Sequence, residues 1–152
     1  MDPDVTDWEN RRVVIFDYYG VYKRMFGQLQ SPKGIRLTHS EIFVIDYRTI
    51  KVFDLELPHS FRRAILTVPD DQPQPWTFTI DILHETLYVL ESTKDNDASA
   101  RVNIHNLTDG RLLNSFPITC PKSRFATHLV SDLALISTKL VVAAGNFILV
   151  YS

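Results

Sequence analysis

The chain has one cysteine, five glycines and no long apolar run, and each scarcity excludes a class of protein. Cys120 is the only cysteine among 152 residues, so neither an intramolecular disulfide nor a multi-cysteine zinc site can form. No stretch approaches the roughly 18 consecutive apolar residues of a membrane-spanning helix. The acidic start, MDPDVTDWENRR, is also unlike a secretory signal. These absences predict a cytoplasmic protein.

Neither positive nor negative charge is in large excess: the net charge is -2 and the pI is about 6.2. General attraction to nucleic acid or to an anionic membrane is therefore not expected. The distribution is uneven: residues 1–10 carry four acids and no Lys or Arg, and residues 11–63 carry ten Lys and Arg against five acids. Residues 64–152 carry six Lys and Arg against nine acids. We predict an acidic N-terminal tail over residues 1–10, followed by a locally basic segment.

What the chain does contain is a short strand motif that recurs four times. Each copy has a β-branched residue, any residue, an aliphatic residue, an aromatic residue or histidine, and a small polar residue. The copies are Val13–Asp17, Ile50–Asp54, Val102–Asn106 and Ile148–Ser152. Their starts are 37, 52 and 46 residues apart, close to the roughly 40–50 residues of one blade in a β-propeller.

Further strand-like segments accompany these motifs. Runs rich in branched and aromatic residues precede three of the copies, at residues 41–46, 85–91 and 138–144, and shorter apolar runs come earlier still, at residues 34–37, 78–82 and 132–136. A fourth strand follows the motif at residues 21–26 and 111–116, after turns such as the one with Asp109-Gly110. No segment competes as a long helix. The repeating unit is therefore predicted to be a four-stranded antiparallel meander that buries its faces against copies of itself.

One of these units resembles an NHL repeat. The resemblance covers residues 16–54 and is carried by Phe16-Asp17-Tyr18-Tyr19-Gly20, Phe26-Gly27, Ser31-Pro32-Lys33-Gly34-Ile35, Ile42-Phe43-Val44-Ile45-Asp46 and Ile50-Lys51-Val52-Phe53-Asp54. Residues 75–116 follow the same order of strands, and residues 124–152 keep only the hydrophobic pattern. The resemblance implies a β-propeller. It also implies binding to protein or RNA through one face, or, among related six-bladed propellers, hydrolase or lyase activity with a metal on the axis.

We therefore predict an all-β fold, a propeller-like array of four-stranded antiparallel blades that is incomplete, with about three blades. The propeller-like domain is assigned to residues 11–152, with a partial blade at 11–30 and further blades at 31–70, 75–117 and 124–152. Closed propellers usually have at least ~4 blades, so about three blades would not close a ring. Two explanations stay open: missing blades in a larger chain, or a homodimer that closes a six-bladed ring by lending residues 21–26 to its partner.

Motifs for catalysis and for cofactors are missing. The sequence has no glycine-rich phosphate-binding string and no Gly-x-Ser-x-Gly elbow. The run Asp95-Asn96-Asp97 resembles the start of a calcium loop, but Ala100 and Asn106 stand where that loop needs Gly and Glu. The five histidines are widely spaced. We predict no enzyme activity, no cofactor and no metal.

The predicted function is a binding or scaffold module that uses a propeller face for protein–protein interaction. RNA binding through the basic residues 23–63 is the alternative, since cations grip phosphates and interleaved aromatics such as Tyr18 and Tyr19 stack on bases. A fragment of a propeller hydrolase or lyase is the second alternative. The candidate binding residues are Lys33, Arg36, Tyr47, Arg48, Lys51, Arg62 and Arg63.

Overall fold

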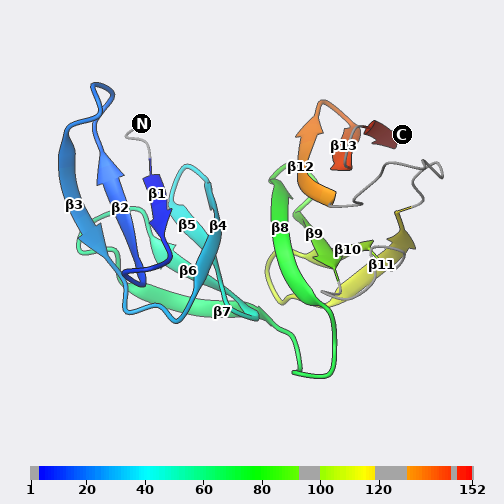
Figure 1. Cartoon of the computed structure of the whole chain (residues 1–152), viewed down its shortest axis with the longest axis horizontal. Helices are drawn as coiled ribbons and strands as arrows, with labels where there is room; N and C mark the ends of the chain where they lie inside the picture. Colours follow the sequence, from blue (N-terminus) through cyan, green and yellow to red (C-terminus); the bar gives the residue numbers. More distant parts are fainter. Residues whose placement is uncertain (1–3, 93–99, 119–129, 145–146, 152) are drawn as a thin grey trace. The chain divides into compact units, whose positions relative to one another are not determined.

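A computed structural model describes residues 4–92, 100–118, 130–144 and 147–151, and every regular element in these ranges is a β-strand (Figure 1). The strands form four antiparallel sheets of three or four strands, each built from consecutive strands. The all-β prediction and the prediction of antiparallel, propeller-like sheets are confirmed. Two compact units contain these sheets, Met1–Thr67 and Val68–Ser152.

The first unit holds the first and second sheets. The strands of the first sheet are β1 (Asp4–Asp7), β2 (Arg12–Phe16) and β3 (Tyr22–Phe26). The strands of the second sheet are β4 (Pro32–Leu37), β5 (Glu41–Asp46), β6 (Thr49–Asp54) and β7 (Phe61–Thr67). Both are meanders, in which each strand pairs with the next one along the chain.

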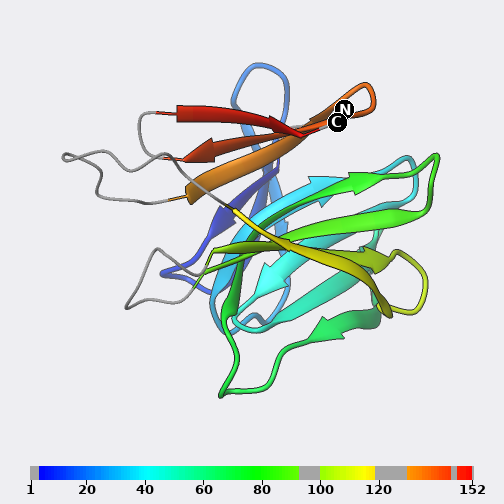
Figure 2. The same cartoon turned by 90° about the vertical axis from the view of Figure 1, so that its right-hand side faces the viewer.

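The second unit holds the third and last sheets. The strands of the third sheet are β8 (Gln74–Asp81), β9 (Thr86–Ser92), β10 (Arg101–Asn106) and β11 (Leu112–Pro117). The strands of the last sheet are β12 (Val130–Ile136), β13 (Lys139–Ala144) and β14 (Phe147–Tyr151). Figure 2 shows the strands of the last sheet side by side, in orange to red.

The core of the first unit lies between its two sheets. Alternate residues of β2 and β5 point into it, and Phe53 of β6 and Leu29 of the β3–β4 connection complete it. The buried members are Val13, Leu29, Ile42, Val44 and Phe53. Because side chains alternate across a strand, the residues between these core residues point to the opposite face of each sheet.

The second unit has a corresponding core between the third and last sheets. Its buried members are Leu90, Ala100, Val102, Ile118, Leu133, Leu140 and Val142. The strands β8 and β12 lie against each other, and the Thr77 hydroxyl donates a 2.9 Å hydrogen bond to Asp132 Oδ1 between them. Both units therefore repeat one arrangement, a meander packed face to face on the next meander.

The structure differs from the sequence prediction at the N-terminus. Residues 1–10 were predicted to be an acidic tail, but Asp4–Asp7 form β1 and pair with β2, Val5 lying opposite Val14. Ladder hydrogen bonds depend on the backbone and not on side-chain polarity, so an acidic segment can still add an edge strand. The first blade therefore begins before residue 11 and has three strands. The partial blade predicted at residues 11–30 is thus a sheet of three strands, and the last sheet also has three.

Candidate interaction surface

All seven residues predicted as candidate binding residues lie on the second sheet. Lys33 and Arg36 are in β4, Tyr47 and Arg48 form the turn between β5 and β6, Lys51 is in β6, and Arg62 and Arg63 are in β7. Sharing a sheet does not place them in one patch. Five of them, Tyr47, Arg48, Lys51, Arg62 and Arg63, belong to two groups, one at each end of β5.

The first group surrounds Asp46, a carboxylate that is 3% exposed at the end of β5. Lys51 Nζ is 2.6 Å from Asp46 Oδ2. The backbone amides of Gln30 and Ser31 each donate a 2.7 Å hydrogen bond to Asp46 Oδ1. A buried carboxylate requires such partners, so the Lys51 ammonium contributes to the fold by pairing with Asp46.

Tyr47 and Arg48 lie beside this group in a tight turn. Tyr47 has a left-handed φ of 59°, and its amide donates a 3.0 Å hydrogen bond to the Ser31 carbonyl. The Arg48 guanidinium carbon is 5.7 Å from the centre of the Tyr47 ring, within reach of a cation–π interaction. This pair joins a cation and an aromatic ring at the surface of a turn.

The second group surrounds Glu41 at the start of β5. Arg63 binds it through both guanidinium nitrogens, with Nη2 at 3.2 Å from Oε2. Arg62 contacts both Glu41 and Asp54. The hydrogen bond from Arg63, outweighing burial, lowers the pKa of Glu41, and the negative charge of Asp54 raises the pKa of Arg62. Both arginines of β7 are thus engaged by acids of their own sheet.

The two groups are separated by the length of β5. Glu41 and Asp46 are five residues apart along this strand, or about 16 Å at about 3.3 Å per residue. Arg36 and Lys33 lie on the neighbouring strand; Arg36 Nη1 donates a 2.9 Å hydrogen bond to the Ile35 carbonyl, and the Lys33 carbonyl accepts a 2.8 Å hydrogen bond from Thr6. The structure does not bring the seven residues together in one continuous basic surface.

Acids of the N-terminal segment further reduce the basic excess. Arg12 Nε is 2.8 Å from Asp7 Oδ2, and this contact lowers the pKa of Asp7. Because β1 belongs to the same unit as the basic residues, the relevant sum is that of residues 1–67: ten Lys and Arg against nine acids, or a net charge of +1. The unit as a whole is close to neutral.

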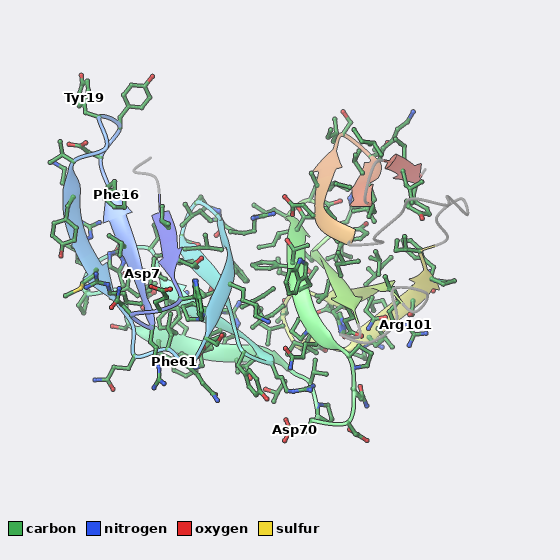
Figure 3. All side chains as sticks on the ribbon, viewed as in Figure 1. Asp7, Phe16, Tyr19, Phe61, Asp70 and Arg101 are labelled. Atoms are coloured by element: carbon green, nitrogen blue, oxygen red, sulfur yellow. The ribbon has the colours of Figure 1, made fainter. Side chains whose placement is uncertain are left out.

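Exposed aromatic side chains gather instead at the tyrosine turn, which we define as residues 17–21 between β2 and β3. Tyr18 is 88% exposed and Tyr19 is 87% exposed. Their rings meet edge to face, with 5.8 Å between the centres. Figure 3 shows Tyr19 at the tip of this turn, pointing away from the strands. The sequence indicated the turn and its tyrosines but not that both rings lie in solvent.

Hydrogen bonds to Asp17 fix the backbone of this turn. Asp17 Oδ1 accepts hydrogen bonds from the amides of Tyr19, at 3.0 Å, and Val21, at 2.9 Å. Lys23 Nζ is 3.0 Å from Asp17 Oδ2. The amide of Val21 and the Lys23 side chain lower the pKa of Asp17, and Gly20 supplies the positive φ of 77°. The two rings are therefore carried on an ordered support.

The described residues also lack a metal-binding cluster and a membrane-spanning helix. Within residues 4–92, 100–118, 130–144 and 147–151, no three His, Cys, Asp or Glu side chains are grouped so as to hold a metal ion. The run Asp95-Asn96-Asp97 and Cys120 lie outside the described residues. In the described part of the chain, no helix has the length and apolarity to cross a membrane.

Comparison with solved structures identifies the type of sheet array. A chain of hydrazine synthase from Kuenenia stuttgartiensis matches 94% of this chain with a TM-score of 0.68 at 17% identity. The Hsv2 proteins of Kluyveromyces marxianus and Kluyveromyces lactis match 98% and 99%, with TM-scores of 0.56 and 0.53 at 13% and 11% identity. These neighbours are β-propeller proteins. The sheets are the blades of an incomplete β-propeller.

The likeness to these propellers concerns the fold alone, because the identities are low. The chain spans 40% of the hydrazine synthase chain and 58% of each of these Hsv2 chains. No family model matches the sequence, and no curated protein matches it. The propeller part of the predicted resemblance is confirmed, whereas the NHL assignment stays a prediction.

Proposed function

We propose that the protein is a non-catalytic binding module that recognises a protein partner through the tyrosine turn. The observation that carries this proposal is the exposure of Tyr18 and Tyr19 on a turn whose backbone Asp17 holds in place. Tyrosine is enriched among the residues that dominate binding energy at protein interfaces. A ring that is already positioned loses little conformational freedom when it binds.

The surroundings of the turn support a protein partner. Val21 is 57% exposed and Tyr22 is 53% exposed, so the aromatic tip continues into apolar surface. The nearby Lys23 ammonium is engaged by Asp17. An apolar centre with paired charges at its border has the composition of a protein interface. A cytoplasmic location, predicted from the lone cysteine, belongs to the same proposal.

Crosslinking with a matched control tests this function. A photo-reactive phenylalanine analogue at position 19 is expected to crosslink one defined protein, which mass spectrometry identifies. The purified partner should then lose affinity for the double variant Tyr18→Ser/Tyr19→Ser by about 100-fold, since two anchoring rings are removed. The control is Leu83→Ser, which removes a side chain that is 86% exposed between β8 and β9. Equal binding by the tyrosine variant and the control would refute the proposal.

RNA binding through residues 23–63 is the second candidate, and the Arg48–Tyr47 pair favours it. The ion pairs of Lys51, Arg62 and Arg63 weigh against it, because acids of the same sheet already balance the charge of these cations. Filter binding to single-stranded RNA across salt concentrations tests it. Affinity that falls steeply with salt, and falls further in Arg48→Ala, would support RNA binding.

Two finer predictions from the sequence also stand as proposals. Descent of the second sheet from an NHL repeat is supported by the matching residues 31–35, 42–46 and 50–54, which lie in or beside β4, β5 and β6. The alternative of a propeller hydrolase or lyase would require a bound metal, which metal analysis of the purified protein would detect.

A further inference from the structure

The two rings of the tyrosine turn form an angled surface, which we call the aromatic corner and define as the side chains of Tyr18 and Tyr19. The planes of the two rings stand at 83° to each other, with 5.8 Å between their centres. Both rings are largely exposed, so a ligand can reach their faces. The angle between the two walls therefore selects among the shapes that a bound segment can have.

Two features of the turn hold this corner in place. The amides of Tyr19 and Val21 donate hydrogen bonds to Asp17 Oδ1, which fixes the backbone that carries the rings. The rings themselves contact each other edge to face. Aromatic pairs favour this arrangement over a face-to-face stack because the ring edge is positive and the ring face is negative. A ligand thus meets a corner that is already formed.

The size and the angle of the aromatic corner match a polyproline II helix. This helix has three residues per turn, so its cross-section is triangular, with ridges of about 60° that can enter a corner of 83°. An α-helix is about 10–12 Å wide with its side chains, which is wider than the 5.8 Å between the ring centres. A β-strand points its side chains alternately to two opposite sides, so it contacts one wall and not both.

The chemistry of the two rings agrees with this shape. Proline side chains are apolar rings, and grooves lined by aromatic residues bind proline-rich segments in the polyproline II conformation. The carbonyl groups of this helix make no internal hydrogen bonds, so a tyrosine hydroxyl can donate to them. A proline-rich segment is also stiff before it binds, so little conformational freedom is lost on binding.

Charge at the turn disfavours the other common ligand of paired aromatic rings, a quaternary ammonium group or a methylated lysine. Such cations bind over aromatic faces. Here the Lys23 ammonium already lies 3.0 Å from Asp17 Oδ2, and residues 1–67 carry a net charge of +1. A second cation would therefore meet an acid that is already paired. An uncharged segment meets no such repulsion.

We propose that the aromatic corner binds an uncharged, proline-rich segment of a partner protein in the polyproline II conformation. The two rings supply apolar walls, their hydroxyls donate hydrogen bonds to carbonyl groups of the segment, and Asp17 holds the turn. This inference rests on the proposed function and adds to it the chemical class of the segment that is recognised.

A blocked decaproline peptide is the probe, because it forms a polyproline II helix and carries no charge. Nuclear magnetic resonance spectra of the protein with isotope-labelled tyrosine should show saturable shifts of the Tyr18 and Tyr19 ring signals. A blocked decamer of alternating glycine and serine should leave these signals unchanged, and so should tetramethylammonium. No shift with decaproline at millimolar concentration, or an equal shift with either of the other two probes, would overturn the proposal.

Substitutions separate the contribution of the rings from that of their hydroxyls. Tyr18→Leu/Tyr19→Leu should weaken decaproline binding by about tenfold or more, since both aromatic faces are lost. Tyr18→Phe/Tyr19→Phe keeps the rings and should weaken binding by only about threefold, through the lost hydrogen bonds. The matched control is Trp8→Leu, which removes a ring that is 64% exposed in the turn between β1 and β2 and should bind normally. Equal binding by the leucine double variant and this control would overturn the proposal.

The crosslink at position 19 distinguishes failure of this inference from failure of the proposed function. Excess decaproline should block the crosslink to the identified partner, and the crosslinked peptide of that partner should be rich in proline. A crosslink to a segment without proline, unaffected by decaproline, would overturn the inference and leave the binding function intact. Failure of the proposed function would instead appear as equal partner binding by Tyr18→Ser/Tyr19→Ser and its control Leu83→Ser.

Discussion

The two units pack the same apolar core between two meanders but differ in how their ionisable groups are paired. Among the described residues of Met1–Thr67, ion pairs join successive strands within a sheet, as between Asp7 and Arg12 and between Asp46 and Lys51. In Val68–Ser152 the buried ionisable groups, Glu91 and His105, lie without a close ion pair in the described residues. The same sheet architecture therefore forms whether or not its buried ionisable groups have an ion-pair partner.

The buried ionisable groups of the second unit have pKa values that are shifted mainly by burial. Burial raises the pKa of Glu91, although the Asn103 side chain and Arg101 oppose the shift. Burial also lowers the pKa of His105, whose Nδ1 lies 2.9 Å from the Gly110 carbonyl. That carbonyl can only accept, so Nδ1 carries the proton, and Nε2 has no hydrogen-bond partner among the described residues. Three acids of the first unit, Asp7, Asp17 and Glu41, have lowered pKa values, as has Asp81 in the second unit.

The largest expected effects come from truncating one buried side chain in each core. The same substitutions test whether the two units unfold independently. Ile42→Ala in the first core and Leu90→Ala in the second remove side chains that are fully buried. Each should cost about 2–5 kcal/mol in the free energy of unfolding. Hydrogen exchange measured by mass spectrometry should show lost protection only in the unit that carries the substitution. Equal loss in both units would mean that they unfold as one.

The next largest effect concerns the buried ion pair of the first unit. Asp46→Asn keeps an acceptor for Gln30 and Ser31 but places an uncharged amide against Lys51, which we expect to cost about 2–3 kcal/mol. Thr77→Val in the second unit removes the hydrogen bond to Asp132 and should cost about 0.5–1.5 kcal/mol. Urea denaturation of both variants measures the difference. A larger cost for Thr77→Val would contradict the contrast between the units.

The same substitution should have opposite signs in the two units. Glu41 has a lowered pKa, so its contribution to stability is present above its ordinary pKa of 4.5 and is lost as the pH falls through its folded value. Glu91 has a raised pKa, so its contribution is present below 4.5 and is lost as the pH rises through its folded value. At pH 7, Glu41→Gln should therefore destabilise the first unit and Glu91→Gln should stabilise the second.

Thermal unfolding at pH 7 and in acid checks these signs. Both effects should shrink in acid, because the native side chains then become neutral like glutamine. Destabilisation of the second unit by Glu91→Gln at pH 7 would show that the carboxylate has a partner that stabilises its charge.

One further pair of substitutions should have equal effects in the two units. Gly20 of the tyrosine turn and Gly110 between β10 and β11 have positive φ values of 77° and 73°. A Cβ at Gly20 would meet no atom within 4 Å. Gly20→Ala and Gly110→Ala should each cost about 1–2 kcal/mol, since the left-handed conformation is strained for alanine. Denaturation of both variants would test this, and a clearly larger loss at one site would point to a contact beyond backbone strain.

Much of the fold could be predicted because strand composition repeats along the chain. The motif copies correspond to β2, β6, β10 and β14, and the runs before them correspond to β5, β9 and β13. The sequence did not indicate β1, whose residues are Asp-Val-Thr-Asp, and named no strand at β7, which begins with Phe-Arg-Arg. Both are edge strands, where one side of the backbone stays solvated and side chains need not be apolar.

The candidate site was less predictable from the sequence than the strands. The basic residues were identified correctly as a compositional feature, but their partners Glu41, Asp46 and Asp54 are spread over 14 positions of the same segment. Only pairing of β5 with β6 and β6 with β7 brings acid and base together. The net charge of residues 11–63 already includes these acids, but it does not show that they pair with Lys51, Arg62 and Arg63.

The sequence by itself determined that the chain forms short antiparallel strands in repeated meanders, because alternation, turn residues and motif spacing are local properties. Tertiary structure decided which cations are neutralised and which tyrosines are exposed. These depend on register and on stacking between strands distant in sequence. A residue's type fixes what it can bind, but its neighbours in space determine whether that capacity is already used.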